Sequence, residues 1–212
     1  MIINYLPEEE SDAEEVVSVI QNTTESQIFT IPGDLRSQEF CESLVDDAAE
    51  MLGGLDILVN NAGFTRAAPN LTSISTEDFI RTMETNTYAP FFLTRAAIPL
   101  LPPGSHILFT SSQIWHNPPY FNADYAASKA WVSIFGQALA SGLLTTNGIK
   151  VNVVRPGLTL TNLLSTQGID TEMAQTQGAS RPLGRIQQPI EIAPLYVDMV
   201  ASNSSFAAGL LD

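Results

Sequence analysis

Short apolar runs alternate along the chain with longer stretches of mixed polarity. The short runs predict strands within residues 2–5, 27–35, 53–63, 106–112 and 149–157, with a last one starting near residue 205. The longer stretches predict helices at residues 12–21, 37–52, 75–101, 123–145 and 188–201. Strands that alternate with helices are typical of α/β proteins, in which helices cover a parallel sheet.

Side chains near the helix ends support these boundaries. Ser37 is placed to cap one helix, and Ser75 with Asp78 resembles a capping box. Pro99 and Pro102 mark the end of the long helix. Residues 158–184 are expected to form a polar loop with at most one short helix. No repeat or linker interrupts the order, so residues 1–212 predict a single domain.

Composition and net charge disfavour several classes of protein. The net charge of −14 disfavours nucleic acid and anionic membranes as partners, because both attract basic surfaces. No apolar run reaches the ~20 residues of a membrane span, and no signal-peptide pattern opens the chain. One cysteine, Cys41, allows no internal disulfide, so we expect a cytoplasmic protein. Two histidines and one cysteine give no ligand cluster, so no metal site is expected.

Three residues carry a recognisable chemistry. Tyr125 and Lys129 are four residues apart, so on a helix they share one face, and Ser112 at the end of an apolar run can face them across a loop. A cation held against a phenol favours the phenolate and lowers the phenol pKa, which makes the tyrosine a usable acid or base. The serine would hold a carbonyl or alcohol oxygen. The alternative is an ordinary pair on a helix surface.

The ordered set of motifs resembles the short-chain dehydrogenase/reductase family. The resemblance runs from Ile2 to about Leu211 and rests on NNAG at residues 60–63, Asn86 in METNTYAPF, Ser112, Tyr125, Lys129, and RPG at residues 155–157. It implies a Rossmann-like doubly wound parallel sheet. It also implies hydride transfer between NAD(P)(H) and a small carbonyl or alcohol, with a catalytic set of Asn86, Ser112, Tyr125 and Lys129.

In this family Asn86 would bend its helix and support a proton relay, and Lys129 would also bind the nicotinamide ribose. The alternative for Asn86 is a buried amide with its hydrogen bonds satisfied. The resemblance further implies that the cofactor is bound by Tyr125, Lys129 and a second set: Asp34, Leu35, Asn61, Ala62, Gly63, Pro156, Gly157 and Thr161. Structural roles remain open for several of these, as a turn residue for Asp34, a tight loop for residues 60–63, and a helix cap for Thr161.

The residues at the end of the first predicted strand favour NADP(H) over NAD(H) as the cofactor. An acid after the second family strand usually binds the 2′-hydroxyl of NAD, but Asn4 and Tyr5 end the corresponding run here, and Arg36 is nearby in sequence. Aromatic and proline residues at 115–121 suggest an apolar or ring-bearing substrate. His116 there is expected to be a wall or surface residue.

The family's glycine-rich phosphate loop has no counterpart before residue 1 in this sequence. We therefore expect the first strand, the first helix and most of the last strand to be missing, which would leave two groups of strands with unpaired edges and allow a homo-oligomer. The chain would then be a fragment, a genuine short relative or a decayed copy. Alternative functions are a cofactor-free isomerase, lyase or cyclase, or a non-catalytic binding partner that completes its sheet with another chain's strand.

Overall fold

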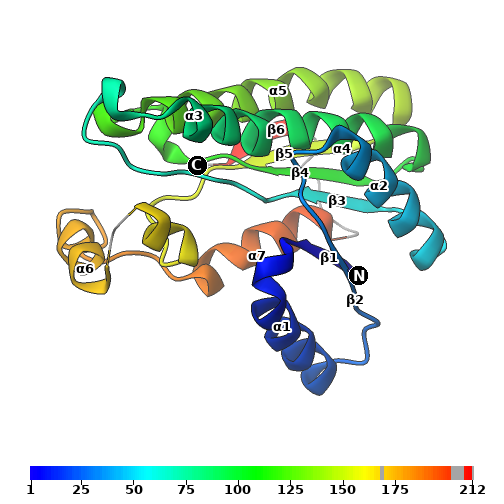
Figure 1. The fold of residues 1–212 in the computed structure, drawn as a ribbon. Coiled ribbons are helices and arrows are strands. Elements are labelled where there is room, and N and C mark those ends of the chain that lie inside the picture. The colour runs from blue at the N-terminus through cyan, green and yellow to red at the C-terminus, as the bar shows by residue number, and fades with distance from the viewer. Residues whose placement is uncertain (168–169, 202–207, 212) are drawn as a thin grey trace.

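The strands form two parallel sheets rather than one. The computed structural model describes residues 1–167, 170–201 and 208–211. One sheet pairs β1 with β2, and the other has the order β3-β4-β5-β6 (Figure 1). The strands are β1 (Ile2–Tyr5), β2 (Phe29–Pro32), β3 (Ile57–Asn60), β4 (His106–Thr110), β5 (Lys150–Val154) and β6 (Ala208–Leu211).

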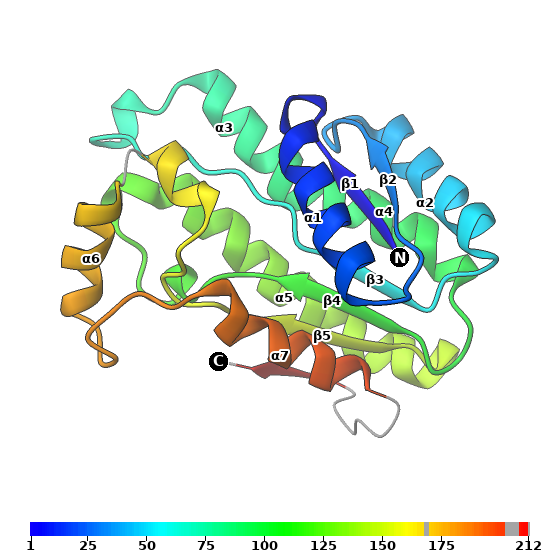
Figure 2. The ribbon, with the colours of Figure 1, turned by 90° about the horizontal axis from the view of Figure 1, so that it is seen from below.

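Helices lie on both sides of these sheets, as in a doubly wound fold. Figure 1 shows α2, α3, α4 and α5 on one face and α1 and α7 on the other, and Figure 2 looks onto the α1 and α7 side. The α-helices are α1 (Glu10–Thr23), α2 (Gln38–Leu52), α3 (Thr76–Met83), α4 (Ala89–Ala97), α5 (Ala123–Asn147), α6 (Thr171–Ala179) and α7 (Pro189–Val200). No described helix is long and apolar enough to cross a membrane.

Short helical turns connect these elements. The 3-10 turns are η1 (Pro7–Glu9), η2 (Leu71–Ser73), η4 (Ile98–Leu100), η5 (Gln113–Trp115), η6 (Tyr120–Asn122) and η7 (Asn162–Gln167), and η3 (Glu84–Tyr88) is a π-helical turn. Two of them, η5 and η6, occupy the segment between Ser112 and Tyr125.

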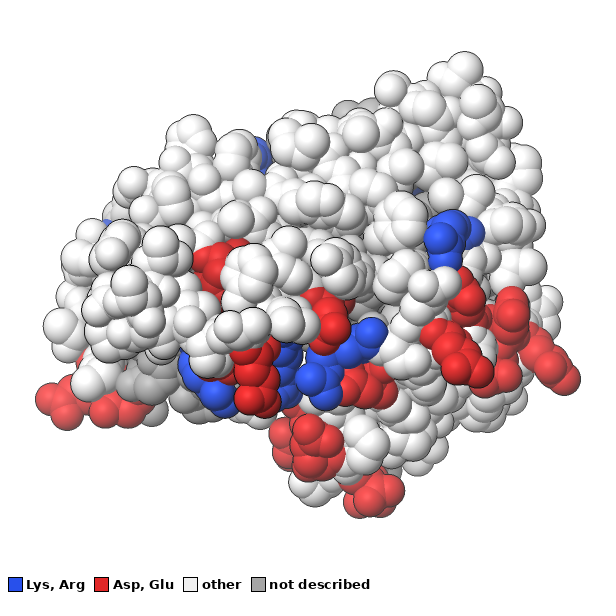
Figure 3. All heavy atoms as spheres, turned by 45° about the horizontal axis from the view of Figure 1, so that its top comes forward, with Lys and Arg blue, Asp and Glu red and all other residues white. Residues whose placement is uncertain are grey.

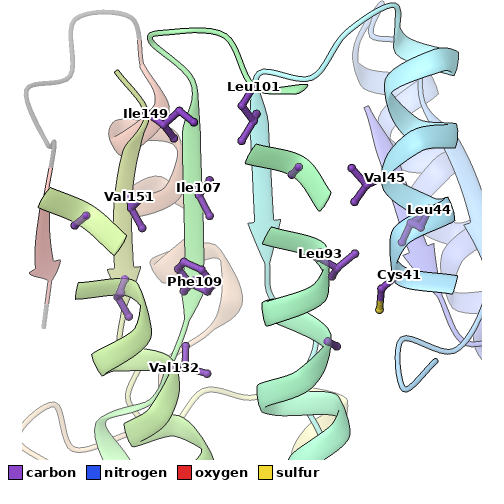
Figure 4. Close-up of a cluster of buried hydrophobic side chains, with 14 residues drawn as sticks. Cys41, Leu44, Val45, Leu93, Leu101, Ile107, Phe109, Val132, Ile149 and Val151 are labelled. Carbon is purple, nitrogen blue, oxygen red and sulfur yellow. The ribbon is translucent and has the colours of Figure 1, made fainter. Parts of the chain in front are cut away.

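Alternating side chains of the central strands build two cores. Ile107 and Phe109 of β4 point to one face, where they pack in a cluster with α2, α4 and α5 (Figure 4). Leu108, between them, points to the other face and packs with Val154 and with Met199 of α7. All five of these side chains are at most 1% exposed. The middle of the larger sheet is therefore covered on both sides, as its apolar runs predict.

The long helix predicted over residues 75–101 is present, because α3, η3, α4 and η4 follow one another without a gap from Thr76 to Leu100, with a π turn in its middle. Ser75 caps α3 as expected, accepting a hydrogen bond from the Asp78 backbone N–H at 3.0 Å. The π turn η3 then inserts around Asn86 before α4 begins. A π turn adds a residue to the helical repeat, and here it places the Asn86 amide inward, where it is 1% exposed.

Two expectations concern the C-terminal part of the chain. Residues 158–184 hold one short α-helix, α6, as expected, after the 3-10 turn η7, and Asp170 caps α6 by accepting from the Met173 N–H at 2.8 Å. The last strand is present, because β6 pairs with four consecutive residues of β5, from Val151 to Val154. The expectation that most of this strand is missing is therefore not confirmed.

The division into two groups of strands agrees with the sequence analysis. Among the described strands, β1 has only β2 as a neighbour and β3 has only β4, so each has one open edge. On β3, Leu58 contributes to the core with α2 and α4, so Ile57 and Val59 point to the opposite face. These two side chains are 42% and 45% exposed. Whether a first strand is missing stays a prediction.

The charged side chains are unevenly distributed over the surface. Helix α5 contains Asp124 and Lys129 as its charged residues, and both are buried. Figure 3 accordingly shows a broad uncharged area over the helical face that is uppermost in Figure 1, while acidic side chains gather along one side.

The open edge of β3 is expected to make the chain self-associate. Replacing Ile57 and Val59 by threonine keeps β-branched residues on the strand but removes exposed apolar surface. We expect the wild-type chain to gain mass in sedimentation velocity as its concentration rises, and the Ile57→Thr/Val59→Thr variant to gain less. Leu71→Thr, which alters an exposed leucine of η2, is the control. Equal association of all three chains would contradict the prediction.

Candidate active site

The predicted catalytic residues meet where β3 and β4 end. Parallel strands bring their carboxyl ends to one edge of a sheet, and here that edge carries the loop after β3, Ser111 and Ser112 after β4, and the start of α5. Tyr125 and Lys129 lie in the first two turns of α5 and are 8% and 3% exposed. The two side chains are therefore buried rather than on the helix surface.

Tyr125 and Ser112 are directly linked. Their side chains form a hydrogen bond, which by itself lowers the pKa of the Tyr125 phenol. Ser112 is also the N-cap of η5, because its hydroxyl oxygen accepts from the Ile114 backbone N–H at 3.2 Å. This cap holds the serine in one orientation at the start of the loop. The pairing expected across the loop is thus present.

Lys129 is held by the sheet rather than by the tyrosine oxygen. Its ammonium donates to the backbone carbonyl of Thr110 at 2.8 Å and lies 5.7 Å from the centre of the Tyr125 ring. Burial disfavours the charged form and lowers the pKa of Lys129 to about 8. The residue's own carbonyl accepts from the Ser111 hydroxyl at 2.7 Å, which ties the helix to β4 a second time.

The lowering of the phenol pKa by Lys129 stays a prediction, because burial and the Ser112 hydrogen bond are the influences on Tyr125 in this structure. Burial raises the pKa of Tyr125 to about 12, and the hydrogen bond with Ser112 offsets only part of this rise. The physical reason is that desolvation penalises a phenolate strongly, while the ammonium faces the Thr110 carbonyl. The tyrosine is therefore a protonated acid at neutral pH.

Both the oxygen and the nitrogen of the buried Asn86 amide are hydrogen-bonded within the protein. Its Oδ1 accepts from the Phe64 N–H at 2.7 Å, and its Nδ2 donates to the Phe64 carbonyl and to Ser128 Oγ, both at 2.9 Å. The side chain thus joins the loop after β3 to α5 next to Lys129. This arrangement matches the alternative of a satisfied buried amide. The relay role assigned through the resemblance would use its main chain and stays a prediction.

The loop at residues 60–63 lies beside these side chains. Asn60 donates to Thr94 Oγ1 at 3.2 Å, and Asn61 Oδ1 accepts from the Thr110 hydroxyl at 2.9 Å. A Cβ added to Gly63 would lie 3.2 Å from the Lys129 ammonium nitrogen and 3.6 Å from Asn86 Oδ1. Glycine is needed at this position because the backbone comes close to the buried amine. Asn61 and Ala62 are exposed and border the site.

Asp34 and Leu35 follow β2 and so belong to the smaller sheet. Asp34 forms an ion pair with Arg36, with 2.7 Å between its Oδ2 and the Arg36 Nε, and this hydrogen bond lowers the pKa of the carboxyl. Leu35 packs against the main core, and its carbonyl accepts from the Cys41 thiol at 3.0 Å. The structure therefore gives both residues local structural roles, and their contact with a cofactor remains a prediction.

The turn after β5 reaches the serine loop. The carbonyl of Pro156 accepts from the Gln113 N–H at 3.1 Å, and a Cβ on Gly157 would lie 3.2 Å from Gln113 Nε2. Pro156 and Gly157 therefore lie next to Ser112. Thr161 is further along and exposed, and its carbonyl accepts from the Leu164 N–H at 3.0 Å at the start of η7.

Several residues of the site were missed by the sequence analysis. Ser128, which holds Asn86, follows Tyr125 by three residues and could have been found from helical spacing. Thr110 ends β4, and its carbonyl and its hydroxyl form hydrogen bonds with Lys129 and Asn61. Tyr196 bonds the Thr110 hydroxyl from 86 residues away, so no local pattern in the sequence indicates it.

The described residues fit one end of a dinucleotide better than the other. The buried amine, the phenol and the close-lying Gly63 form a polar cradle suited to the sugar and nicotinamide. The glycines with positive φ at Gly53, Gly54, Gly104 and Gly148 precede strands, so they lie at the opposite edge from Tyr125, and Gly184 lies in the loop between α6 and α7. Within the described ranges, no glycine-rich turn opens a helix toward Tyr125, and no acidic, histidine and cysteine cluster suits a metal ion.

Comparison with known proteins defines the class. Residues 1–210 match the sequence model of the family described as enoyl-(acyl carrier protein) reductase. The uncharacterized oxidoreductase YghA of Escherichia coli is 39% identical over 204 residues, which cover 96% of this chain and 69% of that protein. The chain belongs to the short-chain dehydrogenase/reductase family of oxidoreductases.

Solved structures show the same fold. A dehydrogenase/reductase from Sinorhizobium meliloti superposes with a TM-score of 0.88 and 31% identity, covering 99% of this chain and 81% of that one. A short-chain dehydrogenase from Burkholderia cenocepacia in complex with NADP gives a TM-score of 0.86 and 29% identity, covering 100% and 85%. The Rossmann-like α/β class predicted from the sequence is confirmed.

Removing the Asn86 amide should destabilise the whole site. In Asn86→Ala, two backbone groups of Phe64 and the Ser128 hydroxyl lose a buried partner, which we expect to cost about 2–4 kcal/mol of unfolding free energy. Urea denaturation measures this difference. Asn22→Ala, in the exposed helix α1, is the matched control and should cost less than about 1 kcal/mol. Equal losses of unfolding free energy in the two variants would show that the Asn86 hydrogen bonds are unimportant for stability.

Lys129→Met should stabilise the chain at neutral pH. Below pH 8 the lysine is charged in both the folded and unfolded states, so the folded state carries the full cost of burying the ammonium. From pH 8 to the ordinary value of 10.5, the folded state loses the proton first, and this cost disappears.

The expected advantage of Lys129→Met is therefore about 1–3 kcal/mol at pH 7 and smaller at pH 10. Denaturation at a series of pH values measures it, and Lys150→Met controls for the loss of one lysine elsewhere. An advantage that does not change with pH would exclude a buried charge as its cause.

Proposed function

We propose that the protein is an NAD(P)(H)-dependent oxidoreductase that interconverts a carbonyl and an alcohol by hydride transfer, with Tyr125 as the general acid and base. The observation that carries this proposal is the buried hydrogen bond between Tyr125 and Ser112 beside the Lys129 ammonium. Family membership supports the class of reaction. When bound, the cofactor supplies or accepts the hydride.

Tyr125 and Ser112 would act on the substrate oxygen together. In reduction, the Ser112 hydroxyl holds the carbonyl oxygen and the Tyr125 hydroxyl donates its proton to that oxygen. Because burial raises the phenol pKa to about 12, the resting enzyme carries this proton at neutral pH and is ready to act as an acid. The reverse reaction needs the phenolate, so it requires additional positive charge at the site.

Lys129 is the group that can supply this charge. Its ammonium is already buried on the same helix face, and the carbonyl of Thr110 keeps it directed at the strand end. We assign it to the ribose hydroxyls of the cofactor and to the electrostatic support of Tyr125. Asn86 supports both residues through Ser128 and the loop at Phe64. The other proposed cofactor contacts are Asp34, Leu35, Asn61, Ala62, Gly63, Pro156, Gly157 and Thr161.

NADP(H) is the preferred cofactor in this proposal. Strand β1 ends in Asn4 and Tyr5 rather than in an acid that could bind the ribose 2′-hydroxyl of NAD, and the Asn4 amide is occupied by the carbonyls of Ile31 and Gly33. The Burkholderia relative in complex with NADP supports this choice. Arg36 is paired with Asp34, so it would have to leave that carboxylate to bind a 2′-phosphate.

The substrate class follows from the loop between Ser112 and Tyr125. Tyr120 and Phe121 in this loop are 67% and 47% exposed, and Trp115 lies under the Arg155 guanidinium, 5.2 Å from its ring centre. Exposed aromatic rings beside a catalytic hydroxyl suit an apolar or cyclic carbonyl compound. A small cyclic ketone and an aromatic aldehyde are therefore the first substrates to test.

A second candidate is a cofactor-free isomerase or lyase that keeps Tyr125 as its acid. The observation that favours it is the position of the positive-φ glycines away from this edge, because dinucleotide pyrophosphate usually binds at a glycine-rich turn before a helix. Such an enzyme would use the Tyr125 and Ser112 pair without hydride transfer.

Cofactor titration of the purified chain separates the two functions. NADPH and NADH binding is followed by the fluorescence of the two tryptophans, together with reduction of the aldehyde. We expect Tyr125→Phe to keep its NADPH affinity within about threefold but to lose about 10²–10⁴ in kcat/KM, because it removes the proton donor. Tyr88→Phe, at an exposed tyrosine, is the control and should retain activity.

The result that would overturn the oxidoreductase proposal is equally definite. A folded chain that binds neither nucleotide at millimolar concentration cannot use the site for hydride transfer. Isomerisation or elimination that depends on Tyr125 under the same conditions would instead support the cofactor-free function.

A further inference from the structure

Thr110 joins three parts of the molecule at the end of β4. Its hydroxyl lies 2.6 Å from the Tyr196 hydroxyl of α7 and 2.9 Å from Asn61 Oδ1 in the loop after β3. Its backbone carbonyl accepts from the Lys129 ammonium of α5 at 2.8 Å. One residue therefore contacts two groups that the proposed function assigns to the cofactor, Asn61 and Lys129.

The direction of these hydrogen bonds follows from the orientation of the Asn61 amide. Thr110 has a single hydroxyl proton, which it donates to Asn61 Oδ1. The remaining contact to Thr110 must then be donated by the Tyr196 hydroxyl. Because Oδ1 of Asn61 is used as the acceptor, its Nδ2 amino group is turned away from Thr110. The exposed Asn61 side chain thus presents a donor at the edge of the site.

Tyr196 is well placed to fix this arrangement. It packs in the cluster of Leu108, Val154 and Met199, which anchors α7 against the sheet. Met199 is fully buried, so the helix cannot shift without disturbing that core. Burial also raises the pKa of the Tyr196 phenol, which keeps it a donor at neutral pH.

We propose that Tyr196 is a positioning residue that acts through Thr110: it holds the Thr110 carbonyl on Lys129 and turns the Asn61 amino group toward the cofactor. This inference rests on the proposed function for the identity of the ligand. Tyr196 bonds Thr110 and not Asn61 or Lys129 themselves, so it would act on these two groups through Thr110.

The first test measures NADPH affinity in three variants. Tyr196→Phe removes the first donor, and Thr110→Val removes both side-chain hydrogen bonds while keeping a β-branched residue in the strand. We expect each to raise the Kd by about three- to tenfold. Thr110→Ser keeps the hydroxyl and should restore an affinity within about twofold of the wild type. Unchanged affinity in both Tyr196→Phe and Thr110→Val would overturn the proposal.

A second test needs no cofactor, so it separates this inference from the proposed function. The chain contains two lysines, Lys129 and Lys150, so ¹³Cε-lysine labelling gives two resonances, and Lys129→Met assigns them. The group facing Lys129 that also titrates is Tyr125, on the same helix. A less firmly held Thr110 carbonyl stabilises the ammonium less, so the titration midpoint of Lys129 should fall in Tyr196→Phe and Thr110→Val.

The outcomes are distinct. A lower midpoint in these two variants, with the wild-type value in Thr110→Ser and in the control Tyr88→Phe, supports the proposal even if the wild type binds no NADPH. An unchanged midpoint accompanied only by a lower melting temperature would show that Tyr196 is merely a packing residue, and would overturn it.

Discussion

The burial of the Lys129 ammonium is the constraint on which the site depends. A buried charge needs a hydrogen-bonding partner, and the carbonyl at the end of β4 supplies it. The surrounding contacts keep these two groups together, since Ser111 ties α5 to β4 and Gly63 leaves room for the amine. The strand ends, the loop after β3 and α5 thus form one polar unit inside an otherwise apolar core.

The same burial controls the neighbouring phenol. With the ammonium directed at a carbonyl, desolvation dominates at Tyr125, and the phenol stays protonated. Burial therefore shifts the two pKa values in opposite directions. The lysine loses its proton more easily, and the tyrosine holds its proton more firmly. Both shifts favour neutral side chains. A ligand that brings negative charge to this edge would favour the charged lysine and oppose the phenolate, which couples ligand binding to the protons on both side chains.

The sequence predicted what depends on local spacing. The strand and helix order, the caps at Ser37 and Ser75, and the meeting of Tyr125 with Ser112 follow from short-range pattern and from parallel strands. Local spacing does not indicate the π turn at Asn86, for which the family resemblance implied only a bend, because the turn is stabilised by partners 22 and 42 residues away. The direction in which the Tyr125 pKa shifts could not be predicted for a related reason: sequence spacing shows which charges are near but not how much water is excluded.

The division of the strands also bears on how the protein unfolds. Strands β1 and β2 and helix α1 form one unit, in which Ala13 is the buried residue of α1. This unit contacts the main core through Ile31 of β2, together with Leu35 and Phe40. Among the described strands, no ladder of backbone hydrogen bonds joins this unit to the four-stranded sheet. Cooperative unfolding of this unit with the four-stranded sheet therefore depends on a few side chains beside α2. Amide hydrogens of residues 2–32 should accordingly exchange with solvent through a local opening that leaves β4 and β5 protected, so that the two sheets behave as separate cooperative units.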